Sequence, residues 1–143
     1  MKTNLTTFFI VLFMIFSFHK TYASYVSNPL KEKDAKSIMI TYVNAITLGM
    51  DEYNKYLFAD DFEYKNSVNN DSFNKKEYLK FLNSSKGLKF NCRSEYKILD
   101  QTGNSCIAKA MLKFDNFTRI DIITLQLTND GWKISKVITN YEK

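Results

Sequence analysis

Histidine, cysteine, proline and glycine are scarce in this chain of 143 residues, which contains one, two, one and four of them respectively. Metal sites built from several cysteine and histidine ligands are therefore excluded, and so are small secreted folds that depend on many disulfide bonds. The low glycine and proline content also excludes collagen-like and low-complexity chains. Apolar residues make up 45% of the sequence and charged residues 24%, which is typical of a globular chain, and the length predicts one domain.

The first 23 residues have the layout of a secretory signal peptide. Lys2 gives a basic start, residues 8–16 (FFIVLFMIF) form an unbroken apolar run, and Thr21 and Ala23 stand three and one positions before a cut at Ser24. The alternative is a retained membrane anchor, but a spanning helix needs about 20 apolar residues. We therefore expect an exported bacterial protein, periplasmic or secreted, with residues 24–143 as its mature domain and no stable membrane anchor.

Removal of this segment changes the histidine content and the net charge of the domain. His19 is the only histidine, so the mature domain has no imidazole. The loss of Lys2 and Lys20 reduces the basic residues from 20 to 18 against 15 acidic ones, which lowers the formal charge from +5 to +3. The remaining lysines are interspersed with acidic residues, as on a solvated surface, so we expect no nucleic-acid partner.

The two cysteines lie in two predicted strands, 88–99 and 105–114. A three-residue loop with Gly103 in the left-handed conformation would pair Ile98 with Cys106 and place Cys92 opposite Leu112. At ~3.3 Å per residue the two sulfurs would then lie on the order of 20 Å apart, whereas a disulfide requires Cα atoms within ~7 Å. The sequence therefore predicts two buried free thiols and no disulfide.

Hydrophobic periodicity predicts three helices in the first part of the domain. The first helix begins at Asn28-Pro29 and ends at Gly49, and a short second helix follows Asp51 as its cap. The third starts with capping-box spacing at Asn74 and Glu77, and Gly87 closes it.

A brief strand at 62–65 and four later strands at 88–99, 105–114, 118–128 and 132–141 complete the pattern. Asp130-Gly131 is the predicted turn between the last two strands, which sets Leu127 opposite Ile134 and Ile123 opposite Ile138. The order predicts an α+β domain with helices on one face of a curved, mostly antiparallel sheet.

Several short stretches resemble the nuclear transport factor 2-like superfamily. They are residues 42–45 (YVNA) with 48–51 (LGMD), residues 57–64 (LFADDFEY) and residues 130–134 (DGWKI). The resemblance covers about residues 34–141 and is nearest to the SnoaL-like branch that carries the name lumazine-binding. It implies a cone-shaped α+β fold, which ketosteroid isomerases, dehydratases and many non-catalytic binding domains share.

The catalytic members of that superfamily allow a comparison of site residues. Alignment on residues 59–61 places Asn66 where isomerase-like members carry a carboxylate general base, and an amide cannot take a proton. Dehydratase-like members depend on histidine, which residues 24–143 lack. The resemblance therefore favours a protein without catalytic residues or cofactors.

An enzyme remains an alternative, with Tyr42 as the superfamily's hydrogen-bonding tyrosine and Asp60, Asp61 or Glu63 as its carboxylate partner. Asp60 and Asp61 are adjacent in extended chain and point to opposite sides, which suits a turn better than an acid/base pair. The oxygen-bearing residues between Asn66 and Asp71 lack the spacing of a calcium loop, so we expect no metal site.

The predicted inner face of the sheet carries small side chains among large ones. Ser94 would lie opposite Ala110 and Tyr96 opposite Ala108, which leaves space between the sheet and the first helix for a ligand. The predicted pocket residues are Tyr42, Phe62, Tyr64, Ser94, Tyr96, Ala108, Ala110 and Phe114. The alternative is that aromatic side chains fill the same space as an ordinary core.

Two functions follow from these patterns, and they are compatible. The first is binding of a small, partly apolar molecule in the cone without turnover. The second is homodimerisation through the sheet, because Ile120, Ile122 and Val137 are expected on its outer side and make that side more apolar than a solvated face requires.

Overall fold

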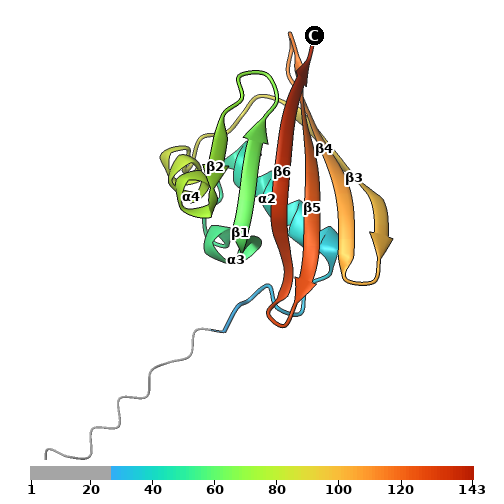
Figure 1. The fold of residues 1–143 in the computed structure, drawn as a ribbon. Helices are drawn as coiled ribbons and strands as arrows, with labels where there is room; N and C mark the ends of the chain where they lie inside the picture. Colours follow the sequence, from blue (N-terminus) through green and yellow to red (C-terminus); the bar gives the residue numbers. More distant parts are fainter. Residues whose placement is uncertain (1–26) are drawn as a thin grey trace, which may run out of the picture.

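The computed structural model describes residues 27–143, which fold into three helices and one six-stranded sheet (Figure 1). The helices are α2 (Ala35–Leu48), α3 (Asn54–Leu57) and α4 (Lys75–Ser84). The strands are β1 (Phe58–Asn66), β2 (Ser72–Asn74), β3 (Arg93–Thr102), β4 (Ser105–Lys113), β5 (Thr118–Thr128) and β6 (Gly131–Glu142). The predicted signal peptide and its cut at Ser24 lie outside the described residues.

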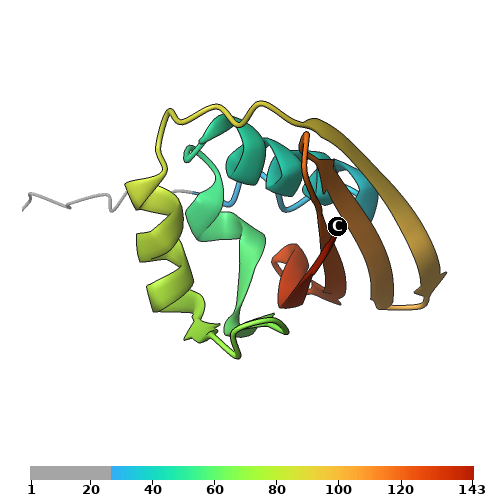
Figure 2. The same ribbon diagram turned by 90° about the horizontal axis from the view of Figure 1, so that it is seen from above.

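The sheet has the strand order β2-β1-β6-β5-β4-β3 and is antiparallel except where β1 pairs with β6. It is open and strongly curved, with α2 lying in its concave face and α4 beside β1 and β2 (Figure 2). The predicted α+β cone with helices on a curved, mostly antiparallel sheet is confirmed. The short strand β2, which lies between β1 and α4, was not expected.

Helix α2 is shorter than predicted, because it begins after Asp34 rather than at Asn28-Pro29. The Asp34 carboxylate accepts a hydrogen bond of 2.8 Å from the Ser37 amide and caps the helix. Asn28 instead accepts from the Leu30 amide and holds a turn ahead of the helix. The helix ends at Gly49, as predicted, in the left-handed conformation.

The predicted cap of α4 is found in the structure, whereas the predicted cap of α3 is not. The capping box of α4 is confirmed, since Asn74 accepts from the Glu77 amide at 3.1 Å and Glu77 accepts from the Asn74 amide at 2.9 Å. This helix ends at Ser84, before Gly87. Asp51 does not cap α3, because its carboxylate pairs with Lys86 at 2.8 Å.

The register predicted between β3 and β4 is wrong by two residues. The turn is the two-residue Gly103-Asn104, so Thr102 pairs with Ser105 and Gln101 with Cys106. A bulge at Leu99 then brings Ile98 opposite Ala108. The combined shift of two leaves each side chain on its predicted face, because the period of a strand is two.

The cysteines are correspondingly farther apart along the hairpin than predicted. Cys106 is opposite Gln101, whereas Cys92 precedes the first residue of β3, and both are free thiols. Cys106 is buried as predicted, but Cys92 is only partly buried because it lies in the irregular chain before the sheet.

The pairing predicted between β5 and β6 is also wrong. Asn129-Asp130 forms the turn, so Leu127 lies opposite Trp132 and Leu125 opposite Ile134. Gly131 has φ 92° and comes so close to the backbone of Lys31 that a Cβ there would lie 2.5 Å from its carbonyl oxygen. A bulge at Ser135 then pairs Ile123 with Val137, and Val137 therefore lies inside the core rather than on the predicted outer side.

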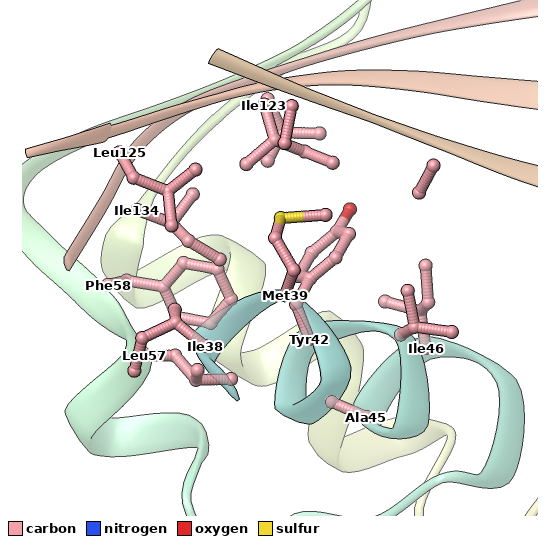
Figure 3. Packing of buried hydrophobic residues seen from close by; sticks show 14 of the residues in the cluster. Ile38, Met39, Tyr42, Ala45, Ile46, Leu57, Phe58, Ile123, Leu125 and Ile134 are labelled. Atoms are coloured by element: carbon pink, nitrogen blue, oxygen red, sulfur yellow. The ribbon is translucent and has the colours of Figure 1, made fainter. Parts of the chain in front are cut away.

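The core lies between α2 and the concave face of the sheet (Figure 3). Ile38, Met39 and Tyr42 point from one side of α2 toward Ile123 and Ile134 on the strands. These side chains are fully buried, which provides the main hydrophobic stabilisation of the domain. Tyr42 is the member of this helix face that carries a polar group into the interior.

Candidate functional site

The antiparallel strands bring distant residues into rows across the concave face. The row nearest the carboxyl end of β6 contains Ser94, Leu112, Arg119 and Tyr141. The second row contains Tyr96, Ala110, Asp121 and Thr139, and the third is the apolar row of Ile98, Ala108, Ile123 and Val137. Charged side chains on this face are therefore concentrated in the first two rows, at one end of the cone.

Asp121 is the centre of a buried network of hydrogen bonds. Its Oδ2 accepts from the Tyr42 hydroxyl at 2.8 Å, and its Oδ1 accepts from the Thr139 hydroxyl at 2.6 Å. Arg119 donates from Nε to Oδ1 at 2.9 Å and from Nη2 to Oδ2 at 3.0 Å. The Tyr78 hydroxyl on α4 lies 3.4 Å from that of Tyr42. We call these five residues the Asp121 network.

Burial determines the protonation of the network. It raises the pKa of the Tyr42 phenol well above its ordinary value, and the nearby Asp121 raises it further. Burial also raises the pKa of Tyr78 to about 12. Burial by itself lowers the pKa of Arg119, but the Asp121 carboxylate together with Tyr42 and Tyr78 outweighs this effect and holds that pKa above its usual range. At neutral pH both tyrosines are therefore protonated and Arg119 is a cation.

The four donors around Asp121 determine its chemistry. An ionised carboxylate has about four lone-pair positions, and Tyr42, Thr139 and the two Arg119 nitrogens supply four donors. No lone pair is left in this arrangement to accept a proton from a substrate. The geometry is thus suited to holding Arg119 and Tyr42 in place rather than to general base catalysis.

Aromatic side chains surround the end of the cone at which the network lies. The ring centroids of Phe90 and Phe114 are 6.1 Å apart, those of Phe114 and Phe117 are 4.6 Å apart and stacked, and those of Phe117 and Tyr141 are 5.9 Å apart. Phe90, Phe117 and Tyr141 are each 38–39% exposed. We call these four residues the aromatic rim.

The chain around the rim is fixed by backbone hydrogen bonds. Phe90 follows α4 and donates its amide to the Thr47 carbonyl near the end of α2 at 2.8 Å, and the Phe114 amide closes the β4–β5 turn on the Phe117 carbonyl at 2.9 Å. Tyr141 of β6 pairs directly with Arg119 of β5. The rim and the network therefore lie at the same end of the sheet, near the β4–β5 turn and the carboxyl end of β6 (Figure 1). We call this the open end of the cone.

Comparison with solved structures identifies the fold. A protein of unknown function from Pectobacterium atrosepticum, of the DUF3225 family, aligns with a TM-score of 0.64 and 14% identity over 77% of this chain and 89% of that one. A nuclear transport factor 2-like protein of unknown function from Methylobacillus flagellatus aligns with a TM-score of 0.61 and 22% identity over 76% and 89%. The protein has the nuclear transport factor 2-like fold.

A third structure with this nuclear transport factor 2-like fold is a ketosteroid isomerase-like protein from Erwinia carotovora atroseptica. It aligns with a TM-score of 0.60 and 12% identity over 76% of this chain and 93% of that one. No protein-family model and no curated protein matches the sequence. At these identities the similarity establishes the nuclear transport factor 2-like fold, and any activity has to be argued from the site.

The predicted pocket residues separate into two groups in this nuclear transport factor 2-like cone. Tyr42, Ala108 and Ala110 are fully buried and Phe62 and Tyr64 nearly so, because Phe58, Tyr78 and the α2 side chains pack against them. Tyr96 and Phe114 are partly exposed, and Ser94 is exposed. Side chains thus pack the deeper part of the cone around the first group, while the second group lies toward the open end.

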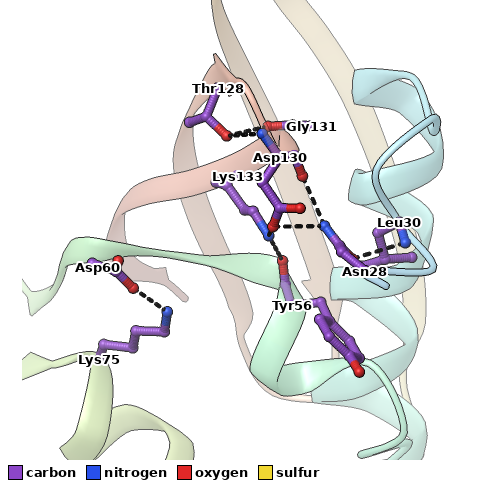
Figure 4. A network of polar contacts seen from close by, with 9 residues as sticks. All are labelled: Asn28, Leu30, Tyr56, Asp60, Lys75, Thr128, Asp130, Gly131 and Lys133. Atoms are coloured by element: carbon purple, nitrogen blue, oxygen red, sulfur yellow. Dashed lines mark hydrogen bonds and ion pairs between the residues drawn. The ribbon is translucent and has the colours of Figure 1, made fainter. Parts of the chain in front are cut away.

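Three surface cavities of about 500, 270 and 440 Å³ lie elsewhere on the nuclear transport factor 2-like domain, and none of the eight predicted pocket residues lines them. The third is bounded by α3, β1 and the β5–β6 turn. Beside it Lys133 donates to the Tyr56 carbonyl and pairs with Asp130, both at 2.8 Å, and Asn28 donates to the Asp130 carbonyl at 2.7 Å (Figure 4). These contacts join the chain before α2 to the far end of the cone.

The carboxylates considered as partners of Tyr42 lie outside the cone. Asp60 is exposed and pairs with Lys75 at 2.8 Å, and Asp61 is also exposed. Glu63 pairs with Lys65 and Lys136 at 2.9 and 3.1 Å. The prediction of these partners is wrong, because they belong to the surface and Asp121 is the carboxylate that Tyr42 reaches.

Asn66 lies at the end of β1 and takes part in a local turn. Its side-chain oxygen accepts from the Val68 amide at 3.0 Å, and its own amide donates to the Asp71 carbonyl at 2.8 Å. Neither contact joins the Asp121 network. Among residues 27–143, no group of three or more His, Cys, Asp or Glu side chains could hold a metal ion.

Arg119 and Asp121 were not identified from the sequence. They share the phase of Ile123 and Leu125, which are fully buried on β5, so the alternation of that strand already places two opposite charges on the inner face. Charged residues in phase with a buried apolar series are the pattern that would have indicated the network. Within the described part of the chain, no helix is long and apolar enough to cross a membrane.

Proposed function

We propose that this protein binds a small, partly apolar molecule at the open end of its cone without converting it chemically. The observation that carries the proposal is the position of the aromatic rim next to the buried Asp121 network. Apolar walls with a few polar groups beneath them are the usual composition of small-molecule sites. Exposed aromatic side chains gathered at one place are unusual on a surface that has no partner.

The cost of the network supports a functional role. Moving a charged group out of water costs several kcal/mol, and a buried ion pair often stabilises a fold no more than apolar side chains of the same size do. The sheet has apolar residues in its third row, so it does not need charges to form a core. Buried charged clusters of this kind are enriched at functional sites.

Binding without turnover agrees with the protonation states and contacts of the network. Asp121 is fully engaged by donors, Tyr42 stays protonated at neutral pH, and Asn66 takes part in its own turn. The mature domain that we propose contains no histidine. These observations favour binding over proton-transfer chemistry.

The test uses the neutral fluorescent probe N-phenyl-1-naphthylamine with the purified full chain. We expect saturable binding that Phe117→Ala and Tyr141→Ala weaken about tenfold, because each removes a stacking surface. Phe81→Ala is the matched control, since Phe81 is a similarly exposed aromatic residue on α4. Absence of saturable binding, or equal affinity in all four proteins, would overturn the proposal.

We also propose that the protein is exported and loses its first 23 residues, on the sequence pattern described above. The test is intact mass spectrometry of the protein recovered from the periplasm or medium of a bacterial host. A chain that begins at Ser24 is expected, and recovery of the full chain only from the cytoplasm would contradict this proposal.

A second candidate function is self-association through the outer face of the sheet. Ile107, Met111, Ile120, Ile122 and Ile138 lie on this face, and Ile122 pairs with Ile138 while Met111 pairs with Ile120. The side chain of Ile107 is 40% exposed. Lys109 lies between Ile107 and Met111 and pairs with Ile122. The apolar side chains around it form a patch of the kind that is typical of an interface.

A further inference from the structure

The guanidinium of Arg119 has one edge that the protein does not use. It carries five N–H donors, and the bonds to Asp121 use one on Nε and one on Nη2. Nη1 makes no hydrogen bond to any described residue. The only enclosed side-chain oxygen or nitrogen without a partner in residues 27–143 is Asn54 Oδ1, so Nη1 is in contact with solvent.

This edge opens at the aromatic rim. Arg119 is only 8% exposed, and its neighbours across the sheet are Leu112 on one side and Tyr141 on the other. Leu112 is fully buried, whereas Tyr141 is 38% exposed and its ring contacts that of Phe117. The deeper rows are closed by core side chains, which leaves the rim side as the route by which solvent reaches Nη1.

Asp121 fixes the orientation of this unused edge before a ligand binds. Two hydrogen bonds fix the guanidinium plane, so little side-chain entropy is lost when a further group binds. The unused edge presents Nη1 together with the second hydrogen of Nη2, which is the fork geometry that suits two oxygens of a carboxylate. Tyr141 pairs with Arg119 across the sheet, and its ring contacts Phe117, which is stacked on Phe114. These rings offer flat apolar surface to an aromatic ligand.

We infer that the ligand is a small aromatic carboxylate, whose acid group is held by Arg119 and whose ring lies on the aromatic rim. This inference rests on the proposed function and specifies its ligand class. Arg119 contributes selectivity for the acid group, because a charge-assisted, bidentate contact is stronger than one to a neutral amide. The rim contributes affinity that does not depend on charge.

The test compares 2-naphthoate with the uncharged 2-naphthamide, which has nearly the same shape. We expect the full chain to bind 2-naphthoate at least about fivefold more tightly at pH 7 and low salt. In ¹⁵N-labelled protein, 2-naphthoate is expected to shift the Arg119 Nε–H resonance and the backbone amides of Phe117 and Tyr141. 2-Naphthamide is expected to shift only the two backbone amides.

Arg119→Lys provides the matched variant, because it keeps the charge next to Asp121 but removes the fork. The preference for 2-naphthoate over 2-naphthamide should fall below about twofold. Arg93→Lys is the control, since Arg93 is exposed at the start of β3. If Arg119→Lys does not fold, the comparison of 2-naphthoate with 2-naphthamide in the unaltered protein still tests whether the site selects a carboxylate.

The outcomes separate this inference from the function on which it rests. Equal affinity for 2-naphthoate and 2-naphthamide, with N-phenyl-1-naphthylamine still bound at the rim, would overturn the inference that the ligand is a carboxylate. The proposed binding site would still stand. Failure of all three probes at the rim would overturn both. Shifts confined to the outer face of the sheet would also overturn both.

Discussion

Asp121 is the residue on which the buried polar network depends, since it accepts from three different side chains. Asp121→Asn would remove its charge and place an amide NH₂ group against donors from Arg119 or Tyr42. A buried guanidinium without its counter-charge typically costs about 3–5 kcal/mol. We therefore expect the free energy of unfolding, measured in urea, to fall by about that amount.

Asp61→Asn is the control for this substitution, because Asp61 is exposed. It should change the unfolding free energy by less than about 0.5 kcal/mol. A similarly small change for Asp121→Asn would mean that Arg119 is not held by the carboxylate as described.

Tyr78 makes stability depend on pH in the alkaline range. Its pKa is raised from 10.0 to about 12 by burial, so between these values the unfolded chain releases a proton that the folded chain keeps. The stabilising contribution is complete below pH 10 and is lost as pH rises toward 12. We expect the urea midpoint to fall more steeply between pH 9.5 and 11.5 than it does in Tyr78→Phe. Identical slopes in the two proteins would contradict a buried, protonated Tyr78.

The contact between the end of α2 and the chain after α4 is sensitive to a small change. Gly49 has φ 61°, and a Cβ there would lie 2.5 Å from both the Gly87 nitrogen and the Ser85 carbonyl oxygen. Gly103 has a similar φ of 55°, but its Cβ would meet nothing within 4 Å. Gly103→Ala should therefore cost only the left-handed strain of about 1–2 kcal/mol.

Gly49→Ala should cost about 3 kcal/mol or more, because the backbone of 85–87 must move as well. Thermal unfolding followed by circular dichroism would compare the two variants. Equal losses would indicate that the chain after α4 does not pack on Gly49 as tightly as the structure has it.

The identity of most elements could be predicted from the sequence, but their pairing could not. The capping box at Asn74 and the final glycine of α2 are local interactions, and both agree with the structure. The bulges at Leu99 and Ser135 change the register without leaving a local mark in the pattern of apolar residues. Side chains of β3 lie on their predicted faces because the observed register differs from the predicted one by an even number of residues. Val137 was predicted on the wrong face because the register of β6 at that position differs by an odd number.

The candidate site was harder to predict than the fold because it depends on contacts across the whole molecule. Tyr42 was identified, but its partner Asp121 lies 79 residues later and meets it only when β5 is curved over α2. Helix periodicity also could not show whether Tyr78 and Phe58 fill the deep part of the cone, as they do. The open end is consequently a property of the folded domain rather than of a motif.

The apolar patch on the outer face of the sheet predicts a dimer. Ile122 lies near the middle of the apolar patch, between Lys109 of β4 and Ile138 of β6. A stable interface of standard size buries about 800 Å² on each partner, and we expect these apolar side chains to form its centre. Size-exclusion chromatography with light scattering should give twice the mass of one chain at micromolar concentration.

Ile122→Lys should convert this dimer to a monomer, because the partner would bring a second lysine into an interface that already has Lys109 next to the patch. Val68→Lys is the control, since Val68 is 63% exposed in the β1–β2 loop. A monomeric unaltered protein, or an Ile122→Lys variant that keeps twice the mass of one chain, would exclude this face as the interface. Because the aromatic rim faces the cone and Ile122 faces away from it, the monomeric variant should still bind N-phenyl-1-naphthylamine with unchanged affinity.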